Sequence, residues 1–285
     1  MSIQGRILVV DGMSVLKTTA GGMTFLTNGF AFNFFSQLSA TIKKFPDVKS
    51  IVVVWEGGHA HRAALFPGYK ASRKPSTADV RSSREMTQKI LSLLGVAQVH
   101  ADGYEGDDMG AWLVHNLNAP CLLYSNDKDW LQLVGPSVSI YQKAPLSQGK
   151  KNARVEITRE NFEHLTGWPS PEMYLKAKCI AGDKDEVPGL QGVAEVTAKS
   201  FLLGQELGPK VRQKIEDFIA SPDFTRNMKL ADLRTPQPDI KPIWHDTVTS
   251  DVGKDLLRTY LEENEWKKVL SDYDNWWDLY NTRRL

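Results

Sequence analysis

Acidic side chains recur at positions that a fold could bring together. Asp11 and Glu56 come directly after short apolar runs, and Asp127 lies just beyond a third. Further acids stand in small groups along the chain, namely Glu105, Asp107, Asp108, Asp129, Asp183 and Asp185. Carboxylates drawn into one place would repel one another unless cations bound among them.

The donor chemistry of these acids indicates which cation they would take. No histidine or cysteine accompanies them at a matching spacing. Oxygen ligands without nitrogen or sulfur favour Mg²⁺ or Mn²⁺ over zinc. So many carboxylates suit two ions about 4 Å apart, the arrangement that activates water and stabilises the leaving oxygen in phosphodiester hydrolysis. The acids therefore predict a phosphodiesterase with two metal ions.

Each acid taken alone also has a structural interpretation. An acid in the first turn of a helix interacts favourably with the helix dipole, and aspartate is common where a strand meets a loop. Helix capping alone would account for Asp127. The metal interpretation depends on the conjunction of all nine carboxylates after successive elements.

A basic segment follows Glu56. Between residues 62 and 89 there are seven basic residues and two acidic ones. The basic residues are Arg62, Lys70, Arg73, Lys74, Arg81, Arg84 and Lys89. Their charges could meet phosphates, and Tyr69 could stack on a base. A solvated loop and helix face is the alternative, but the position after Glu56 would place the segment beside the acidic crevice.

A glycine-rich turn precedes a helical pattern later in the chain. Gly189 and Gly192 stand three residues apart, just before a predicted helix that contains Lys199. Backbone amides at such a helix N-terminus can bind a phosphate. Alone the turn is a weak indication, because glycine-rich helix connections occur for many reasons.

The elements that must position these groups alternate along the first half of the chain. Apolar runs at residues 7–10, 51–55, 96–100 and 121–124 predict buried strands. Helical patterns lie between them at residues 28–45, 84–94 and 105–117. This alternation predicts a doubly wound, mostly parallel α/β sheet, in which the carboxyl ends of the strands line the ligand-binding crevice.

The second part of the chain has a different pattern. We predict a capped short helix ending at Gly167, then helices over residues 171–181 and 195–203. Residues 221–250 contain prolines and little periodicity, which predicts surface loops. From residue 251 the chain is again helical, and its tryptophans are expected to pack the tail onto the body.

Composition sets only broad limits. The 285 residues are 41% hydrophobic and 24% charged, with a formal net charge of +1, so basic surface must come from clustering. The two cysteines lie far apart, which disfavours a disulfide framework or a structural zinc site. No apolar stretch approaches membrane-spanning length, so the expected setting is the cytoplasm.

Together these segments resemble the flap endonuclease / 5′→3′ exonuclease superfamily, which includes phage flap nucleases and the 5′-nuclease domain of bacterial DNA polymerase I. The resemblance is carried by residues 61–73, 103–108, 125–133 and 182–198. It implies a PIN-like nuclease domain over residues 1–168 with a helical arch at about 62–90. It also implies a helical DNA-binding region over residues 169–285, with a helix-hairpin-helix at about 180–204 and C-terminal helices packing back.

The resemblance also implies roles for individual residues. The nine acids would be ligands and neighbours of two Mg²⁺ or Mn²⁺ ions, with Asp127 also counted as catalytic. Lys70 would neutralise the scissile phosphate, with Arg73 as its partner and Tyr69 as a base-stacking residue. The remaining DNA contacts would come from Arg62, Lys74, Arg81, Arg84, Lys199 and the Gly189–Gly192 turn, which in this family often binds a monovalent cation such as K⁺.

The implied substrates are DNA with 5′ ends, flaps or junctions, and RNA in an RNA–DNA hybrid, bound by a monomer. Two departures from the family pattern bear on metal binding. Glu56 stands where aspartate is usual, and the Asp183–Asp185 spacing is one residue short. They leave open a catalytically weak protein that binds branched DNA. A PIN-type ribonuclease is the other alternative.

Overall fold

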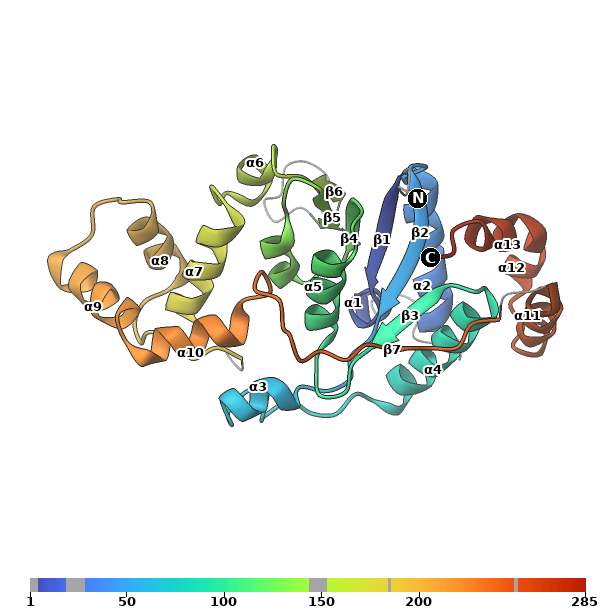
Figure 1. Cartoon of the computed structure of the whole chain (residues 1–285), viewed down its shortest axis with the longest axis horizontal. Coiled ribbons are helices and arrows are strands. Elements are labelled where there is room, and N and C mark those ends of the chain that lie inside the picture. Colours follow the sequence, from blue (N-terminus) through green and yellow to red (C-terminus); the bar gives the residue numbers. More distant parts are fainter. Residues whose placement is uncertain (1–4, 19–28, 144–152, 184–185, 249–250) are drawn as a thin grey trace.

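The computed structural model describes residues 5–18, 29–143, 153–183, 186–248 and 251–285 (Figure 1). Its strands are β1 (Arg6–Asp11), β2 (Val48–Val54), β3 (Ala97–His100), β4 (Cys121–Tyr124), β5 (Val138–Lys143), β6 (Arg154–Ile157) and β7 (Ile243–Trp244). The helices of the first half are α1 (Gly12–Thr18), α2 (Gly29–Lys44), α3 (Ala60–Leu65), α4 (Ala78–Leu93), α5 (Gly106–Asn116) and the 3₁₀ helix η2 (Lys128–Leu133). The later helices are α6 (Phe162–Thr166), α7 (Pro171–Ala181), α8 (Glu195–Leu202), α9 (Pro209–Ile219), α10 (Pro222–Ala231), α11 (Asp251–Glu263), α12 (Lys267–Leu270) and α13 (Tyr273–Asn281).

The strands form one sheet in the order β6-β5-β4-β1-β2-β3-β7. Strands β1 to β5 are parallel, and β6 and β7 pair antiparallel at the two edges. The predicted mostly parallel α/β sheet is confirmed. Because β1 pairs with both β2 and β4, the direction of winding reverses beside it, and ligands bind at the carboxyl ends of strands at such a reversal. Asp11 ends β1 at this point.

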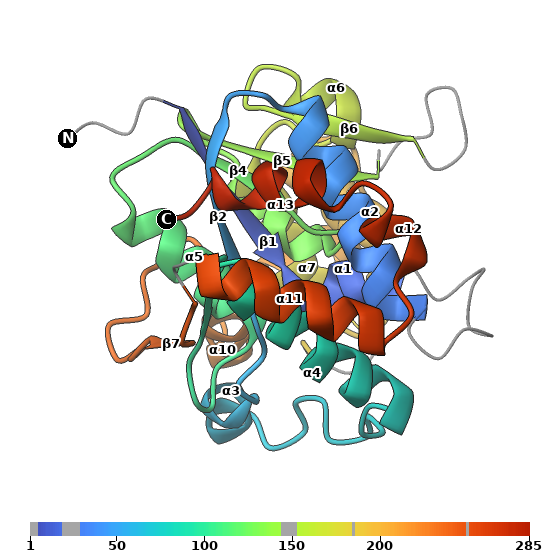
Figure 2. The ribbon, with the colours of Figure 1, turned by 90° about the vertical axis from the view of Figure 1, so that its right-hand side faces the viewer.

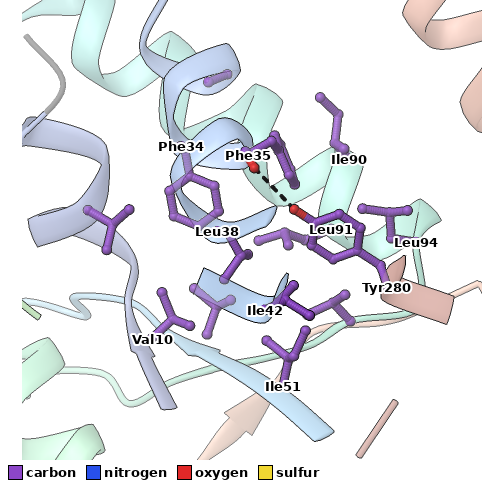
Figure 3. Close-up of a cluster of buried hydrophobic side chains, with 14 of the residues drawn as sticks. Val10, Phe34, Phe35, Leu38, Ile42, Ile51, Ile90, Leu91, Leu94 and Tyr280 are labelled. Carbon is purple, nitrogen blue, oxygen red and sulfur yellow. Dashed lines mark hydrogen bonds between the residues drawn. The ribbon is translucent and has the colours of Figure 1, made fainter. Parts of the chain in front are cut away.

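Helices α2 and α4 cover one face of the sheet, together with the C-terminal helices α11 to α13 (Figure 2). Phe34, Phe35 and Leu38 of α2 are fully buried there beside Tyr280 of α13 (Figure 3). The Tyr280 hydroxyl donates a hydrogen bond to the Phe35 carbonyl oxygen at 3.2 Å. The prediction that the aromatic C-terminal tail packs onto the body is confirmed.

Helices α5, η2 and α7 cover the other face, and α8 to α10 extend the molecule beyond it (Figure 1). Residues 251–285 join the sheet core at the opposite end of the molecule, so the region after residue 168 does not form one continuous helical layer. The domain division at residue 168 stays a prediction. In the part of the chain that is described, no helix has both the length and the apolar character to cross a membrane.

Two sequence predictions about helices were wrong. Residues 222–231 form α10, although the prolines of residues 221–250 were interpreted as loop markers. Pro222 occupies the first turn of that helix, where its missing amide costs nothing, and Ser221 caps it. Helix α4 begins at Ala78 rather than Arg84, because Thr77 caps it by accepting from the Val80 amide.

The predicted arch at residues 62–90 corresponds to two different structures. The second half of this range lies in α4, which packs on the sheet through the buried residues Ile90 and Leu91 near its end. Only α3 and the irregular residues 66–77 stand away from the sheet (Figure 1). We call residues 60–77 the strap.

Candidate nuclease site

A cavity of about 370 Å³ opens at the carboxyl ends of β1, β2 and β4. Five of the predicted acids line it, namely Asp11, Glu56, Glu105, Asp107 and Asp127. Lys17 and the strap residues Lys70 and Arg73 line it as well. The sheet therefore brings together the acids after three strands, and the strap adds cations at the rim.

The environment of Asp11 disfavours the ionised form of its carboxyl group. Its carboxylate accepts hydrogen bonds from the Ser14 amide at 2.9 Å and the Ser125 hydroxyl at 2.7 Å. Burial, aided by the charges of Asp127 and Glu56, nevertheless raises the pKa of Asp11 to about 6. The two hydrogen bonds lower the pKa of Asp11 but do not cancel the effect of burial.

Asp107 shares this environment. The Trp130 indole donates to its carboxylate at 2.7 Å, which fixes the side chain between α5 and η2. Burial, with the charges of Asp127 and Asp11, raises the pKa of Asp107 well above its ordinary value. A divalent cation would reverse the direction of both pKa shifts, because it favours the ionised carboxylate.

The raised pKa of Asp11 predicts a pH-dependent cost in stability. An acid whose pKa is higher in the folded state destabilises the fold as the pH rises from its unfolded value of about 4 towards 6, and the cost then stays constant. For a shift of this size it is roughly 2–3 kcal/mol. In chelator at pH 8 we therefore expect Asp11→Asn to be more stable than the natural protein by up to this amount, and equally stable near pH 4.

Urea unfolding of both proteins at the two pH values measures this effect. Ser14 and Ser125 can still hydrogen-bond the amide, so packing is retained. Mg²⁺ should narrow the difference at pH 8, because it should stabilise the natural protein more than a variant that lacks one of the proposed ligands. A variant that is equally or less stable in chelator at pH 8 would show that the cavity places no strain on Asp11.

A second cavity of about 370 Å³ adjoins the first. Asn126 and Asp127 line both cavities, whereas Asp129 and Asp183 line only the second. Lys178 of α7 lines the second cavity and forms ion pairs with Asp129 and with Asp183, the latter at 3.2 Å. These anions raise the pKa of Lys178 despite its burial, so it is charged.

The donor set of the two cavities fits hard divalent cations. In the described ranges, no three of these acids are already gathered around a point that could hold an ion. Each carboxylate is instead turned to a protein donor, such as Ser125 for Asp11 or Trp130 for Asp107. A divalent ion in either cavity would compete with these donors for the carboxylates. Asp185, the ninth predicted acid, lies outside the described residues.

The assignment of Arg62 to DNA was wrong, and the metal role of Asp108 stays a prediction. Arg62 is 6% exposed and pairs with Glu105 and Asp108. Both oxygens of Asp108 are engaged, one by Arg62 at 2.8 Å and the other by the Glu105 amide at 3.0 Å. The ion pairs of Arg62 with Glu105 and Asp108 therefore join the strap to the start of α5.

The prediction that Tyr69 stacks on a base was also wrong. Tyr69 is 3% exposed and packs with Leu175, Val187 and Leu230 in a small core between the strap and helices α7 and α10. Its hydroxyl donates to Glu105 at 2.5 Å. Tyr69 thus docks the strap onto the helical region and helps to fix a carboxylate.

Glu105 lines the first cavity but is already surrounded by donors. It accepts hydrogen bonds from Arg62, Tyr69 and Lys70. Burial alone would raise its pKa, but Arg62 and Lys70 lower it. Its role as a metal ligand stays a prediction, and its observed role is to hold Lys70 at the rim of the cavity.

Glu186 is a charged residue that the sequence analysis missed. It pairs with Lys70 at 3.0 Å, Arg73 at 2.7 Å and Lys178 at 3.4 Å. Lys70 and Lys178 are the main causes that lower its pKa to about 2 against the effect of burial. Glu186 lies within the segment 182–198 that carries the family resemblance, but neither it nor Lys178 follows a strand, and the packing of the strap on α7 brings the two together with Lys70.

The remaining predicted DNA contacts are placed but not tested. Lys74 and Arg81 are exposed. Arg84 donates to the Glu56 carbonyl oxygen at 2.9 Å, so it fixes the end of β2. Lys199 of α8 lies over the Trp168 ring at 4.9 Å.

The glycine turn connects α7 to α8. A side chain on Gly189 would collide with the Ala181 carbonyl oxygen, so this close approach requires glycine. The Leu190 amide donates to the Ile180 carbonyl oxygen at 2.8 Å, which ties the turn to the end of α7. The turn lies between helices α7 and α8, and its role as a DNA clamp stays a prediction.

The amino-acid sequence of this chain is similar to those of known proteins. Residues 6–167 match the family described as "5′-3′ exonuclease, N-terminal resolvase-like domain". The chain is 32% identical over 203 residues to a 5′-3′ exonuclease of Halalkalibacterium halodurans, covering 69% of this chain and 64% of that protein. It is 26% identical over 293 residues to the thermostable DNA polymerase I of Thermus filiformis, covering 94% of this chain. The alignment spans only 33% of the polymerase.

The fold is also shared with a solved nuclease. The 5′-exonuclease of bacteriophage T5, in a structure with bound zinc, superposes with a TM-score of 0.64 at 19% identity. The match covers 91% of this chain and 98% of that one. The predicted PIN-like architecture is therefore confirmed as the fold.

Proposed function

Because this chain belongs to the 5′-3′ exonuclease family, we propose that it hydrolyses phosphodiester bonds in DNA at 5′ ends, flaps or junctions. The observation that carries the proposal is the cavity in which Asp11, Asp107 and Asp127 meet the strap cations Lys70 and Arg73. Carboxylates for a metal beside cations for a phosphate are the two requirements of metal-assisted phosphodiester hydrolysis.

We propose that two divalent ions, Mg²⁺ or Mn²⁺, bind in the two adjoining cavities. Asp11, Glu56, Asp107 and Asp127 would hold one, and Asp127, Asp129 and Asp183 the other, with Asp185 nearby in the sequence. The bound ions would activate a water and stabilise the leaving oxygen. The T5 relatives support this, since one was solved with zinc and another with DNA and metal ions.

The chain's own cations act on the phosphate. Lys70 lies at the rim of the first cavity with a side chain only 10% exposed, and Glu105 holds its ammonium group. A positioned cation in a site that excludes water stabilises developing negative charge far more than a solvated one. Lys70 would therefore stabilise the charge that builds on the phosphate, and Arg73 would orient the strand beside it.

Substrate selection would depend on shape rather than sequence. Lys74 of the strap and Arg81 of α4 are exposed cations that can follow a DNA backbone, and the loop before α8 can present exposed Gly189 and Gly192 to a phosphate or to K⁺. RNA in an RNA–DNA hybrid has the same phosphates and belongs to the proposed substrates. We propose that the protein acts as a monomer in the cytoplasm.

Two lysine contacts favour a catalytically weak, DNA-binding alternative. Lys178 pairs with Asp129 and Asp183, so it already neutralises part of the second cavity. Glu56 pairs with Lys17 at 3.7 Å, which can compete with a metal at the first. If these lysines are not displaced, the protein would bind branched DNA without cutting it.

Labelled 5′-flap DNA, incubated with Mg²⁺ or with chelator, tests the proposal. We expect cleavage that needs Mg²⁺ and releases products with a 5′-phosphate and a 3′-hydroxyl. Binding without cleavage in both conditions would favour the DNA-binding alternative. Preferential cleavage of single-stranded RNA would favour a PIN-type ribonuclease instead.

We expect Lys70→Ala to lower kcat by about a hundredfold while weakening affinity much less, because its charge acts mainly on the transition state. Lys74→Ala is the matched control, since it removes an exposed cation of the same strap. Steady-state kinetics on the flap substrate separate kcat from KM. An effect of Lys70→Ala confined to KM would make Lys70 a docking residue only.

A further inference from the structure

One carboxylate holds all three cations that face the two cavities from the side of the strap and α7. An oxygen of Glu186 accepts from Lys70 at 3.0 Å and from Arg73 at 2.7 Å, and its other oxygen lies 3.4 Å from the Lys178 ammonium. Lys70 and Arg73 line the first cavity, and Lys178 lines the second. Glu186 thus joins the cationic walls of the two cavities.

The local structure fixes Glu186 in this position. Oδ1 of Asp183 accepts hydrogen bonds from the Glu186 amide at 2.8 Å and the Val187 amide at 2.9 Å. Val187 is 1% exposed and packs against Tyr69 of the strap and Leu175 of α7. The backbone of Glu186 is therefore anchored at the seam between strap and α7, with its side chain turned to the cations of both.

The arrangement resembles the way in which a protein binds a phosphate. The Glu186 side chain is 16% exposed, and the two lysines that it contacts are 10% and 13% exposed. Several charge-assisted hydrogen bonds from lysine and arginine to one small anion are the usual surroundings of a bound phosphoryl group. Because a carboxylate and a phosphate oxygen pair compete for the same donors, both cannot hold these cations at once.

We propose that Glu186 is an internal competitor for the DNA phosphate, which occupies Lys70, Arg73 and Lys178 until a substrate phosphate displaces it. The inference rests on the proposed function for the identity of the displacing anion. Because Glu186 must first be displaced, the affinity for every DNA would be lower. While Glu186 occupies these side chains, fewer protein cations can neutralise DNA phosphates and so release counterions from the DNA. A substrate that engages all three cations would be favoured over single phosphates met along an ordinary duplex.

Glu186→Gln tests this competition, because it removes the charge and retains the size. The control is Glu172→Gln on α7, which removes the same charge from a residue that pairs with Lys176. Binding of labelled 5′-flap DNA is measured in chelator, where no cleavage occurs, over a series of salt concentrations. We expect Glu186→Gln to lower Kd by about tenfold relative to the control. The slope of log K against log salt should steepen by about one, since each freed cation adds about 0.9 to it and the two lysines keep their other carboxylate partners.

A purely structural role would not change the salt slope, which separates the two explanations. Unchanged or weaker DNA binding with an unchanged slope, in a variant whose thermal unfolding shows that it is folded, would overturn the proposal. Calorimetry with inorganic pyrophosphate gives a second measurement without DNA. Tighter pyrophosphate binding by Glu186→Gln in a protein that neither binds nor cuts DNA would refute the proposed function but sustain the competition.

Discussion

Asp127→Asn is expected to slow cleavage of a 5′-flap substrate by about a thousandfold while leaving DNA affinity in chelator unchanged or tighter. Asp127 lines both cavities, so it is the carboxylate that both proposed metal positions would share. Loss of metal stabilisation worth several kcal/mol of activation free energy corresponds to a decrease of this size. Removal of a negative charge near the DNA accounts for the tighter binding.

The substitution should leave the fold intact. The Asp127 carboxylate caps η2 by accepting from the Asp129 amide at 2.9 Å, and asparagine caps helices about as well as aspartate. Single-turnover cleavage in Mg²⁺ measures the rate, with Asp79→Asn in the first turn of α4 as a control. Cleavage at the natural rate by Asp127→Asn would show that Asp127 caps η2 but is not needed for catalysis.

Arg62→Met is expected to destabilise the protein by about 3–5 kcal/mol, because it leaves two buried carboxylates without their shared cation. Arg62 holds Glu105 and Asp108 in a site where all three side chains are at most 10% exposed. Methionine can fill the volume of the aliphatic part but cannot replace the charge. The effect should therefore appear as lost stability and not as lost contact with DNA.

The pH dependence distinguishes this ion pair from a simple packing defect. Arg62 and Lys70 lower the pKa of Glu105, so the stabilisation is present above its ordinary value of 4.5 and is lost as the pH falls through the lower, folded-state pKa. Urea unfolding at pH 7.5 and near pH 4 should give a smaller difference at the acidic pH. Arg81→Met, at an exposed position, should change stability by less than about 0.5 kcal/mol. Equal stability of the two variants would contradict the buried role of Arg62 and favour the DNA contact that was predicted for it from the sequence.

The strands that carry the site could be predicted because burial on both faces leaves a continuous apolar sequence. Residues 7–10, 51–55 and 121–124 fall within or beside β1, β2 and β4 for this reason. The edge strand β6 was missed because an edge needs no such run. Helix α10 was missed because proline at the start of a helix and proline in a loop look the same in a sequence.

The cavity acids could be predicted for a related reason, since parallel strands end at one edge of the sheet. The roles of Arg62 and Tyr69 could not, because a cation or an aromatic ring in an irregular segment has the same sequence signature whether it faces DNA or a buried acid. The roles of Glu186 and Lys178 could not be predicted from the sequence for a third reason. Their charges meet only when the strap packs on α7, and no local pattern encodes that contact.

The account depends on whether the adjoining acidic cavities bind divalent ions. Calorimetric titration of the metal-free protein with Mn²⁺, in the absence of DNA, tests this most directly. We predict saturable binding of two ions by the natural protein and clearly weaker binding, with fewer ions, by Asp127→Asn. The absence of saturable binding, or identical titrations of the two proteins, would contradict the account.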